Sequence, residues 1–277
     1  MAITAVDVNN LRKRTGAGMM DCKKALEEAN GDQEKAIDIL REKGQKVAAN
    51  RSDRQAKEGS VIAKISADGK KGVLTLLNCE TDFVARNEEF VKVAEKIADI
   101  ALNGNFSTLD ELKAADYGDG LTVDKKITEF IGKTGEKMEL AAYEVIHAEK
   151  VFAYNHPGNR LASIVGFSKA DANNLPEVGK EIAMQIAAMA PIAVDKSDVT
   201  QETIDREMNI AKEQARQEGK PEAMLEKIAI GKVNKFYKES TLLNQDFIKD
   251  GKKTVQQFLQ DNDKELKVTG FKRIVIG

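Results

Sequence analysis

The chain of 277 residues contains no tryptophan, and aromatic residues together make up only 5% of it. Single-stranded nucleic acids usually stack their bases on aromatic side chains, so the chain offers few surfaces for that contact. An excess of one charge is also missing, because 43 lysines and arginines stand against 45 aspartates and glutamates. Such a balance creates no bulk field that would attract phosphate backbones or anionic membranes. We therefore expect no direct binding to nucleic acid and no association with a membrane.

Cysteine and histidine are scarce. The two cysteines, Cys22 and Cys79, form no CxxC pair, which is typical of a reducing compartment rather than of a disulfide-linked fold. With His147 and His156 as the only histidines, a zinc or iron site has almost no ligands to draw on. No stretch approaches the roughly 18 apolar residues of a membrane span, and the first residues do not resemble a signal peptide. We expect a cytoplasmic protein with no cofactor and no metal.

Motifs for nucleotide chemistry are absent as well. No GxxxxGK[ST] sequence occurs, which excludes the P-loop class of NTPases. Residues 16–21 begin like a dinucleotide-binding fingerprint, but the third glycine is missing and no strand precedes them, so a turn is the better interpretation. Cys22 lies on the apolar stripe of a predicted helix and Cys79 ends a predicted strand, so both are expected to be packed rather than nucleophilic. The chain is therefore predicted not to be an enzyme.

The N-terminal part has a helical pattern. Between residues 8 and 43, apolar positions recur with helical spacing in three short pieces. Gly31 can end one helix and Asp32 can cap the next. Residues 45–60 are polar and mixed in charge, which indicates a linker or an exposed helix that ends at Gly59. This pattern predicts a compact three-helix module.

The next part combines strands with helices. Residues 61–65 and 72–79 predict a β-hairpin, because apolar residues alternate on either side of an Asp-Gly turn. A helix with an apolar stripe from Phe90 should follow, capped by Asn87. One or two further helices are expected within residues 103–135.

A second hairpin followed by a helix is expected further along the chain. A strand region from Met138 to Tyr154 turns at residues 156–159, returns through residues 161–167, and leads into a helix. This repetition indicates two related halves of one α+β core.

Residues from about 199 to 239 differ from the core. They are rich in charge and carry only a thin apolar seam, interrupted by a turn at residues 219–221. This pattern predicts an inserted antiparallel helical hairpin of the coiled-coil type. The chain, which is long enough for several domains, is thus predicted to be α+β with these parts: a three-helix module and linker, 1–55; the first half of the core, 56–137; its second half, 138–193 and 241–277; and the helical hairpin, 194–240.

Two short segments carry apolar residues that need not belong to the core. Thr81, Asp82, Phe83 and Val84 lie on a short strand-to-helix connection, and such connections often carry binding residues. Phe83 either packs inward or is exposed beside a carboxylate, and the pattern leaves both possibilities open.

Met19 and Met20 are adjacent at a helix start, where successive side chains lie about 100° apart, so at least one is expected to be exposed. His156 lies at the tip of the second hairpin. It is expected to be a turn residue or, as a second choice, a contact residue.

Three ungapped stretches, Thr15–Leu26, Asn30–Asp32 and Asn78–Arg86, resemble bacterial elongation factor Ts. The order of the predicted parts is similar to that family over essentially the whole chain. In that family the first module is similar to ubiquitin-associated domains, so the resemblance implies the same for the N-terminal module of this chain.

The resemblance implies a guanine nucleotide exchange factor that binds elongation factor Tu in its GDP-bound and nucleotide-free forms. It implies that Thr81, Asp82, Phe83 and Val84 enter the GTPase domain and dislocate the nucleotide's magnesium ion, with Phe83 as a wedge. Other residues at matching positions are implied to contact the same protein: Arg12, Met19, Met20 and His156.

Two other functions stay open from the sequence. One is a peptide-binding adaptor of the ubiquitin-associated type that uses residues 1–45. The other is a small-molecule enzyme that uses His156, Asp82 and Tyr154.

Overall fold

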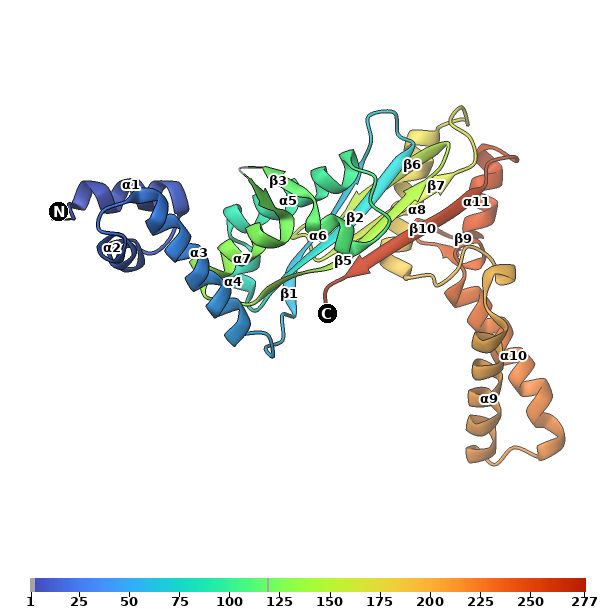
Figure 1. The fold of residues 1–277 in the computed structure, drawn as a ribbon. Coiled ribbons are helices and arrows are strands. Elements are labelled where there is room, and N and C mark those ends of the chain that lie inside the picture. The colour runs from blue at the N-terminus through green and yellow to red at the C-terminus, as the bar shows by residue number, and fades with distance from the viewer. Residues whose placement is uncertain (1–2, 119) are drawn as a thin grey trace.

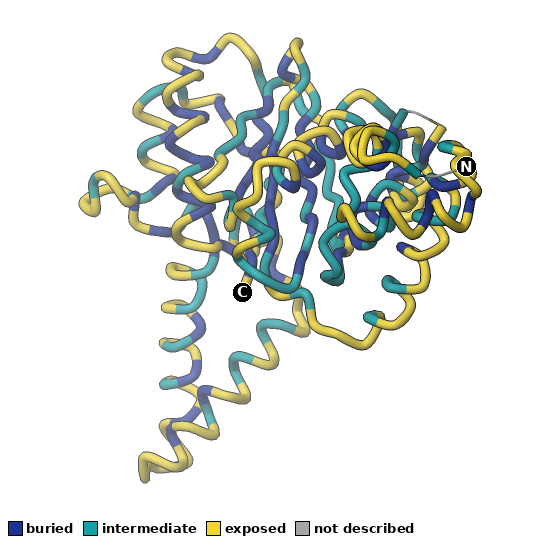
Figure 2. Tube along the Cα trace, turned by 90° about the vertical axis from the view of Figure 1, so that its left-hand side faces the viewer, coloured by how far each residue is buried: buried dark blue, intermediate teal, exposed yellow. Residues whose placement is uncertain are grey.

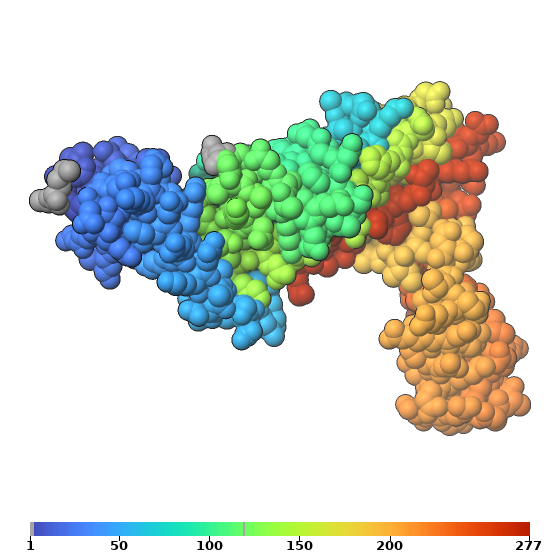
Figure 3. Space-filling model, viewed as in Figure 1, coloured from blue at the N-terminus to red at the C-terminus, as the bar shows by residue number. Residues whose placement is uncertain are grey.

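The computed structural model describes residues 3–118 and 120–277. Helices and small antiparallel sheets are combined, as the α+β prediction requires. Figure 1 shows the first three helices at one end of the molecule, a body of sheets and helices in the middle, and α9 with α10 projecting from the other end. Figure 3 shows the same three parts in outline.

The N-terminal part consists of α1 (Ala5–Thr15), α2 (Met19–Glu28) and α3 (Gln33–Asn50). Asp32 caps α3 as predicted, because its side chain accepts hydrogen bonds from the backbone of the first turn. The three helices enclose a small apolar core: Val8, Leu11, Cys22, Ala25, Leu26, Ala29 and Ala36.

Helix α3 continues through the first part of the expected linker and ends at Asn50. Gly44 explains this extension, because α3 packs there against Gly132 of α7 (Val123–Thr134). A Cβ added to Gly132 would lie 2.8 Å from the Cα of Gly44, so the two helices meet backbone to backbone. The linker is therefore shorter than predicted, and Gly59 lies inside a strand.

The first sheet has the order β1-β2-β5, with β1 (Glu58–Ile65), β2 (Lys71–Cys79) and β5 (Met138–His147), and all neighbouring strands are antiparallel. A large apolar cluster forms between this sheet and its helices. The other elements of this half are α4 (Asp82–Ala85), α5 (Glu88–Asn103), α6 (Leu109–Ala114), β3 (Asp116–Gly118), β4 (Leu121–Thr122) and α7.

The prediction of one strand region from Met138 to Tyr154 within the second half is wrong. The structure divides it into β5 and β6 (Lys150–Asn155), and β5 pairs with β2 along its whole length. A hairpin of β1 and β2 alone would leave the second edge of β2 unpaired, and β5 satisfies those backbone groups. The chain passes to the second sheet only after His147.

The second sheet has the order β10-β7-β6, with β7 (Leu161–Phe167) and β10 (Val268–Val275). One face packs against α8 (Leu175–Met189), and a further apolar cluster joins the two sheets through residues such as Leu74 and Ile164. The remaining elements here are the 3-10 turns η1 (Lys196–Asp198) and η2 (Leu242–Asn244), β8 (Asp246–Phe247), β9 (Asp250–Thr254) and α11 (Val255–Asn262).

Helices α9 (Gln201–Gln217) and α10 (Glu222–Ser240) run antiparallel, because Lys212 pairs with Glu226 while Arg216 pairs with Glu222. Figure 2 shows this projecting pair as mostly exposed or intermediate, in contrast to the buried sheets. A thin buried seam holds the two helices together: Ala211, Ala215, Leu225, Ala229 and Val233. Among the described residues, no helix is both long and apolar enough to cross a membrane.

Candidate functional site

The connection between β2 and α5 forms a single helical turn, α4, with Phe83 at its outer side. Phe83 is 85% exposed, the largest exposed fraction among the large apolar residues described. Val84 and Ala85 are half-buried and pack against the core of the first half. The structure therefore decides the question that the sequence left open, because Phe83 points away from the core while its neighbours anchor the turn. We call residues 81–84 the tip.

Thr81 begins the tip as the N-cap of α4. Its backbone N–H donates to Oε2 of Glu136 at 3.1 Å, and its hydroxyl donates to Oε1 of the same carboxylate at 2.7 Å. The hydroxyl oxygen also accepts a longer bond from the backbone N–H of Val84, at 3.4 Å. Both oxygens of one carboxylate thus hold the first residue of the tip.

Glu80, the residue before the tip, is bound from three sides. It accepts a hydrogen bond from the backbone N–H of Lys137 at 2.6 Å and pairs with Arg51 at 3.1 Å and Arg54 at 3.0 Å. Desolvation alone would raise the pKa of Glu80, but the amide of Lys137 and the two guanidinium groups outweigh it and lower that pKa. Glu80 therefore ties the linker after α3 and the segment before β5 to the base of the tip.

Cys79 lies directly beneath the tip and is fully buried, as the sequence predicted. Its thiol donates a weak hydrogen bond to the carbonyl oxygen of Thr81 at 3.2 Å. Burial, with a smaller contribution from the nearby Glu136 and Glu58 carboxylates, raises the pKa of Cys79 to about 12. The thiol is therefore protonated at neutral pH and supports the tip as a packed side chain.

Asp82 is the charged group of the tip. Its carboxylate pairs with Arg86 at 3.2 Å, one helical turn further on. The Arg86 side chain is 82% exposed and that of Asp82 47%, so this pair contributes little to stability. Asp82 can consequently exchange Arg86 for another charged group at small cost.

Met19 and Met20 are both exposed, at 55% and 62%, where the sequence required only one to be. They occupy the first turn of α2, before the residues that contact the module's core, beginning with Cys22, so neither side chain is covered. Arg12 in the last turn of α1 is exposed as well. The three side chains share the end of the module where α1 passes into α2.

This end of the module adjoins the tip. Gly16, in the connection between α1 and α2, lies so close to Lys133 of α7 that an added Cβ would be 2.6 Å from its Nζ. Lys133 in turn pairs with Glu89, in the first turn of α5 just after the tip. Lys133 therefore connects the segment just before the methionine pair with the helix just after the tip, although Met20 and Thr81 are 61 positions apart in the sequence.

His156 lies in the exposed turn between β6 and β7, where the sequence placed it. Its Nδ1 is 2.8 Å from the hydroxyl of Tyr154. Within residues 3–118 and 120–277, neither side chain forms a hydrogen bond or ion pair with Asp82, so the catalytic group considered from the sequence is not assembled.

The β6–β7 turn lies at the same end of the core as the tip. The carbonyl oxygen of Asn159 accepts a hydrogen bond from Val61 at 2.7 Å, and Arg160 pairs with Glu58 at the start of β1. Glu58 is paired across the sheet with Cys79, the last residue of β2. His156 is thus connected to the base of the tip through β1.

The sequence did not identify the residues that support the tip. Glu136 and Glu80 carry no local pattern that distinguishes them from the many other carboxylates of the chain, and Glu136 is 55 positions from its partner Thr81. In the part of the chain that the structure describes, no three His, Cys, Asp or Glu side chains gather to hold a metal ion. The site is therefore a shaped protein surface with an exposed phenylalanine and a neighbouring carboxylate.

Comparison with known proteins gives consistent matches. The family model described as "Elongation factor TS" matches residues 80–277. A protein named elongation factor Ts from Amoebophilus asiaticus is 51% identical over 277 residues, covering 100% of both chains. Proteins of the same name from Christiangramia forsetii and Porphyromonas gingivalis are 50% and 49% identical, and each match covers at least 99% of both chains.

Proposed function

The chain belongs to the elongation factor Ts family, which makes it a nucleotide exchange factor for elongation factor Tu in translation elongation, and we propose that exchange depends on the tip of Thr81, Asp82, Phe83 and Val84. The observation that carries this proposal is the 85% exposure of Phe83 on a turn that Thr81 and Val84 anchor on either side. A large apolar side chain held outward on a rigid support is suited to insertion between elements of another protein.

The physical task is to weaken the grip on a bound nucleotide. A nucleotide held at about nanomolar affinity, with association near 10⁶ M⁻¹s⁻¹, leaves at about 10⁻³ s⁻¹. Such a rate is too slow for a cycle of translation. The factor must therefore bind the GDP form of elongation factor Tu and lower its affinity for GDP.

We propose that the tip does so by displacing the magnesium ion of the bound nucleotide. In GTPases this ion bridges the phosphates to the protein and is the largest local positive charge. Phe83 would act as the wedge that separates elements around the nucleotide site. Asp82, whose pairing with the exposed Arg86 is weak, would bring a carboxylate that competes for cations there.

Thermodynamic linkage completes the cycle. If the factor lowers nucleotide affinity, bound nucleotide lowers the affinity for the factor by the same ratio. The factor therefore binds most tightly to nucleotide-free elongation factor Tu, and entering GTP releases it. No covalent step is required, so the chain acts on the equilibrium and rate of binding without being an enzyme.

Further contacts would extend over the surface around the tip. Arg12, Met19 and Met20 are proposed to face the GTPase domain, since all three are exposed near the tip. His156 is proposed as a contact from the second half of the core. The exposure of Met19 and Met20 favours a contact with the GTPase domain, because flexible apolar side chains adapt well to a protein surface.

We also propose how the chain is divided into domains. Residues 1–55 would be a ubiquitin-associated-like module with its linker and 194–240 a coiled-coil hairpin. The first half of the core would run from 56 to 147, because β5 completes the first sheet, and 148–193 with 241–277 would form the second half. The two free, buried cysteines support a cytoplasmic location, where thiols stay reduced. The near-zero net charge supports a role without direct nucleic-acid binding.

An adaptor of the ubiquitin-associated type is not favoured. The family match covers residues 80–277, which contain most of the core and exclude the module that such an adaptor would use. The relatives named elongation factor Ts match the whole chain.

The proposed function is tested by stopped-flow release of a fluorescent GDP from elongation factor Tu, with and without this protein. We expect release to accelerate strongly and to saturate with factor concentration. Equal rates with and without the protein would overturn the proposal.

A further inference from the structure

The acidic side chain that holds the tip has a consequence for the exchange reaction. We infer that Glu136 is a positioning residue for exchange: it keeps Phe83 presented outward by holding Thr81 through both carboxylate oxygens. This inference rests on the proposed function. Glu136 itself lies at the base of the tip, so its effect must act through Thr81.

Helix α4 cannot maintain its own shape. It contains four residues, and the first turn of any helix fixes several backbone angles for very few hydrogen bonds. Here the bonds that close the turn are Ala85 N–H to the Thr81 carbonyl at 3.1 Å and Arg86 N–H to the Asp82 carbonyl at 3.0 Å. A segment this short is disordered unless contacts from elsewhere in the protein hold it.

Two kinds of outside contact are present. Val84 and Ala85 pack against the core and anchor the C-terminal side of the turn. On the N-terminal side Glu136 accepts from both the backbone and the hydroxyl of Thr81, at 3.1 and 2.7 Å. Two bonds to one residue fix its orientation, and bonds to a charged acceptor are stronger than neutral ones. Phe83 lies between these two anchors and makes no comparable contact with the residues that the structure describes.

The geometry predicts which step of exchange Glu136 affects. Without the carboxylate, the tip must be ordered during the displacement step, and the cost of that ordering is subtracted from the energy available to displace magnesium. Contacts elsewhere, such as those of Met19 and Met20, would still hold the two proteins together. Loss of Glu136 should therefore lower the maximal rate of GDP release far more than the affinity for elongation factor Tu.

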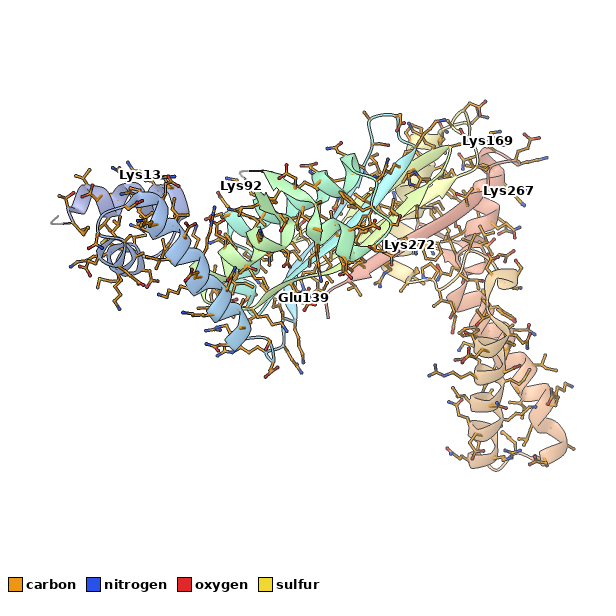
Figure 4. All side chains as sticks on the ribbon, viewed as in Figure 1. Lys13, Lys92, Glu139, Lys169, Lys267 and Lys272 are labelled. Atoms are coloured by element: carbon orange, nitrogen blue, oxygen red, sulfur yellow. The ribbon has the colours of Figure 1, made fainter. Side chains whose placement is uncertain are left out.

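The test compares the full-length protein with Glu136→Ala, Glu136→Gln and the control Glu139→Ala. Glu139 lies three residues further along, on β5, and is exposed; Figure 4 labels it at the edge of the body. Its side chain makes no hydrogen bond or ion pair with any described residue. Stopped-flow release of fluorescent GDP, measured over a range of factor concentrations, separates the maximal rate from the half-saturating concentration.

We expect Glu136→Ala to lower the maximal rate about tenfold, as for loss of a hydrogen bond to a charged group, and to change the half-saturating concentration less than about twofold. Glu136→Gln should restore most of the rate, because its amide oxygen can accept from the Thr81 N–H while its NH₂ donates to the Thr81 hydroxyl. Glu139→Ala should behave as the unmodified protein.

A second pair of variants keeps the test decisive if Glu136→Ala folds poorly. Thr81→Val removes the hydroxyl link and should lower the maximal rate, whereas Thr81→Ser keeps a hydroxyl and should lower it much less. Both Thr81→Val and Glu136→Gln change the same contact. The double variant should therefore release GDP at no less than about half the rate of Thr81→Val alone.

Several outcomes would overturn the inference. Unchanged maximal rates for both Glu136→Ala and Thr81→Val would show that the carboxylate does not position the tip. An equal loss in Glu136→Ala and Glu136→Gln, or a loss confined to the half-saturating concentration, would also contradict it. If the unmodified protein fails to accelerate release, the proposed function is refuted. If the unmodified protein accelerates release and the Glu136 and Thr81 variants do so equally well, only the inference about Glu136 is refuted.

Discussion

Replacing Phe83 by alanine separates a binding role from a structural one. Phe83 is 85% exposed, so folding removes only about 15% of the residue's surface from water. Truncating a fully buried phenylalanine costs about 3–5 kcal/mol, which scaled to the buried part leaves about 0.5–0.8 kcal/mol. In a chain of this size such a loss lowers the melting temperature by about 1–3 °C. Stability should therefore be almost unchanged.

The effect on exchange should be much larger. When the tip enters elongation factor Tu, the exposed part of the ring becomes buried, and aromatic anchors of this kind contribute about 2–4 kcal/mol. At about 1.4 kcal/mol for each factor of ten, the second-order rate constant for exchange should fall about 30- to 1,000-fold. A large loss of exchange rate with almost no loss of stability identifies a side chain that contacts another protein rather than the core of its own.

Thermal unfolding and stopped-flow release of fluorescent GDP measure the two quantities on the same preparation. Phe90→Ala is the matched control, because Phe90 is fully buried in the core of the first half and should lose about 3–5 kcal/mol of stability. A loss of stability in Phe83→Ala comparable to that of Phe90→Ala would refute the reasoning. So would an exchange rate constant within about threefold of the unmodified protein.

Three further changes address the surroundings of the tip. Replacing Met19 and Met20 together by serine should raise the half-saturating concentration severalfold at constant maximal rate and melting temperature, since both side chains are exposed; a changed maximal rate would assign them to displacement instead. Because the pKa of Glu80 is lowered in the folded protein, its carboxylate stabilises the fold above the usual pKa near 4.5, and this contribution is lost as the pH falls through the lower folded value. Urea unfolding from about pH 3 to pH 6 should therefore show a smaller pH dependence in Glu80→Gln, and an unchanged slope would contradict the ion-pair account. Gly132→Ala should destabilise the contact between α3 and α7 by about 1–3 kcal/mol, because the new Cβ would lie 2.8 Å from the Cα of Gly44; unchanged urea unfolding would show that the helices can separate freely.

Local features of the sequence were predicted well. The caps at Asp32 and Asn87 both occur where their residue types indicated helix starts. Each depends on side chains and backbone groups two or three residues apart, so the necessary information is contained in a short stretch of sequence. The exposure of Met19 and Met20 followed from the same kind of geometry, although the structure exposes both.

The allocation of strands was less predictable. β5 reads as part of the second hairpin because it lies next to β6 in sequence, yet it completes the first sheet by pairing with β2. Strand pairing depends on which sheet edge is left open, and that edge is formed by residues 59 to 76 positions earlier, from the pair Cys79–Met138 to the pair Lys71–His147. The continuation of α3 to Asn50 was likewise decided by packing, through the contact between Gly44 and Gly132.

The sequence by itself determined the kind of protein this is. Its composition argued against nucleic acid, membranes and metal, and the stretches Thr15–Leu26, Asn30–Asp32 and Asn78–Arg86 together indicated the elongation factor Ts family. Only the tertiary structure decided that Phe83 faces outward and that Glu136 holds Thr81 from 55 residues away. The physical reason is that a one-turn helix is too short to determine its own conformation, so its orientation depends on carboxylates and apolar side chains that the fold brings to it.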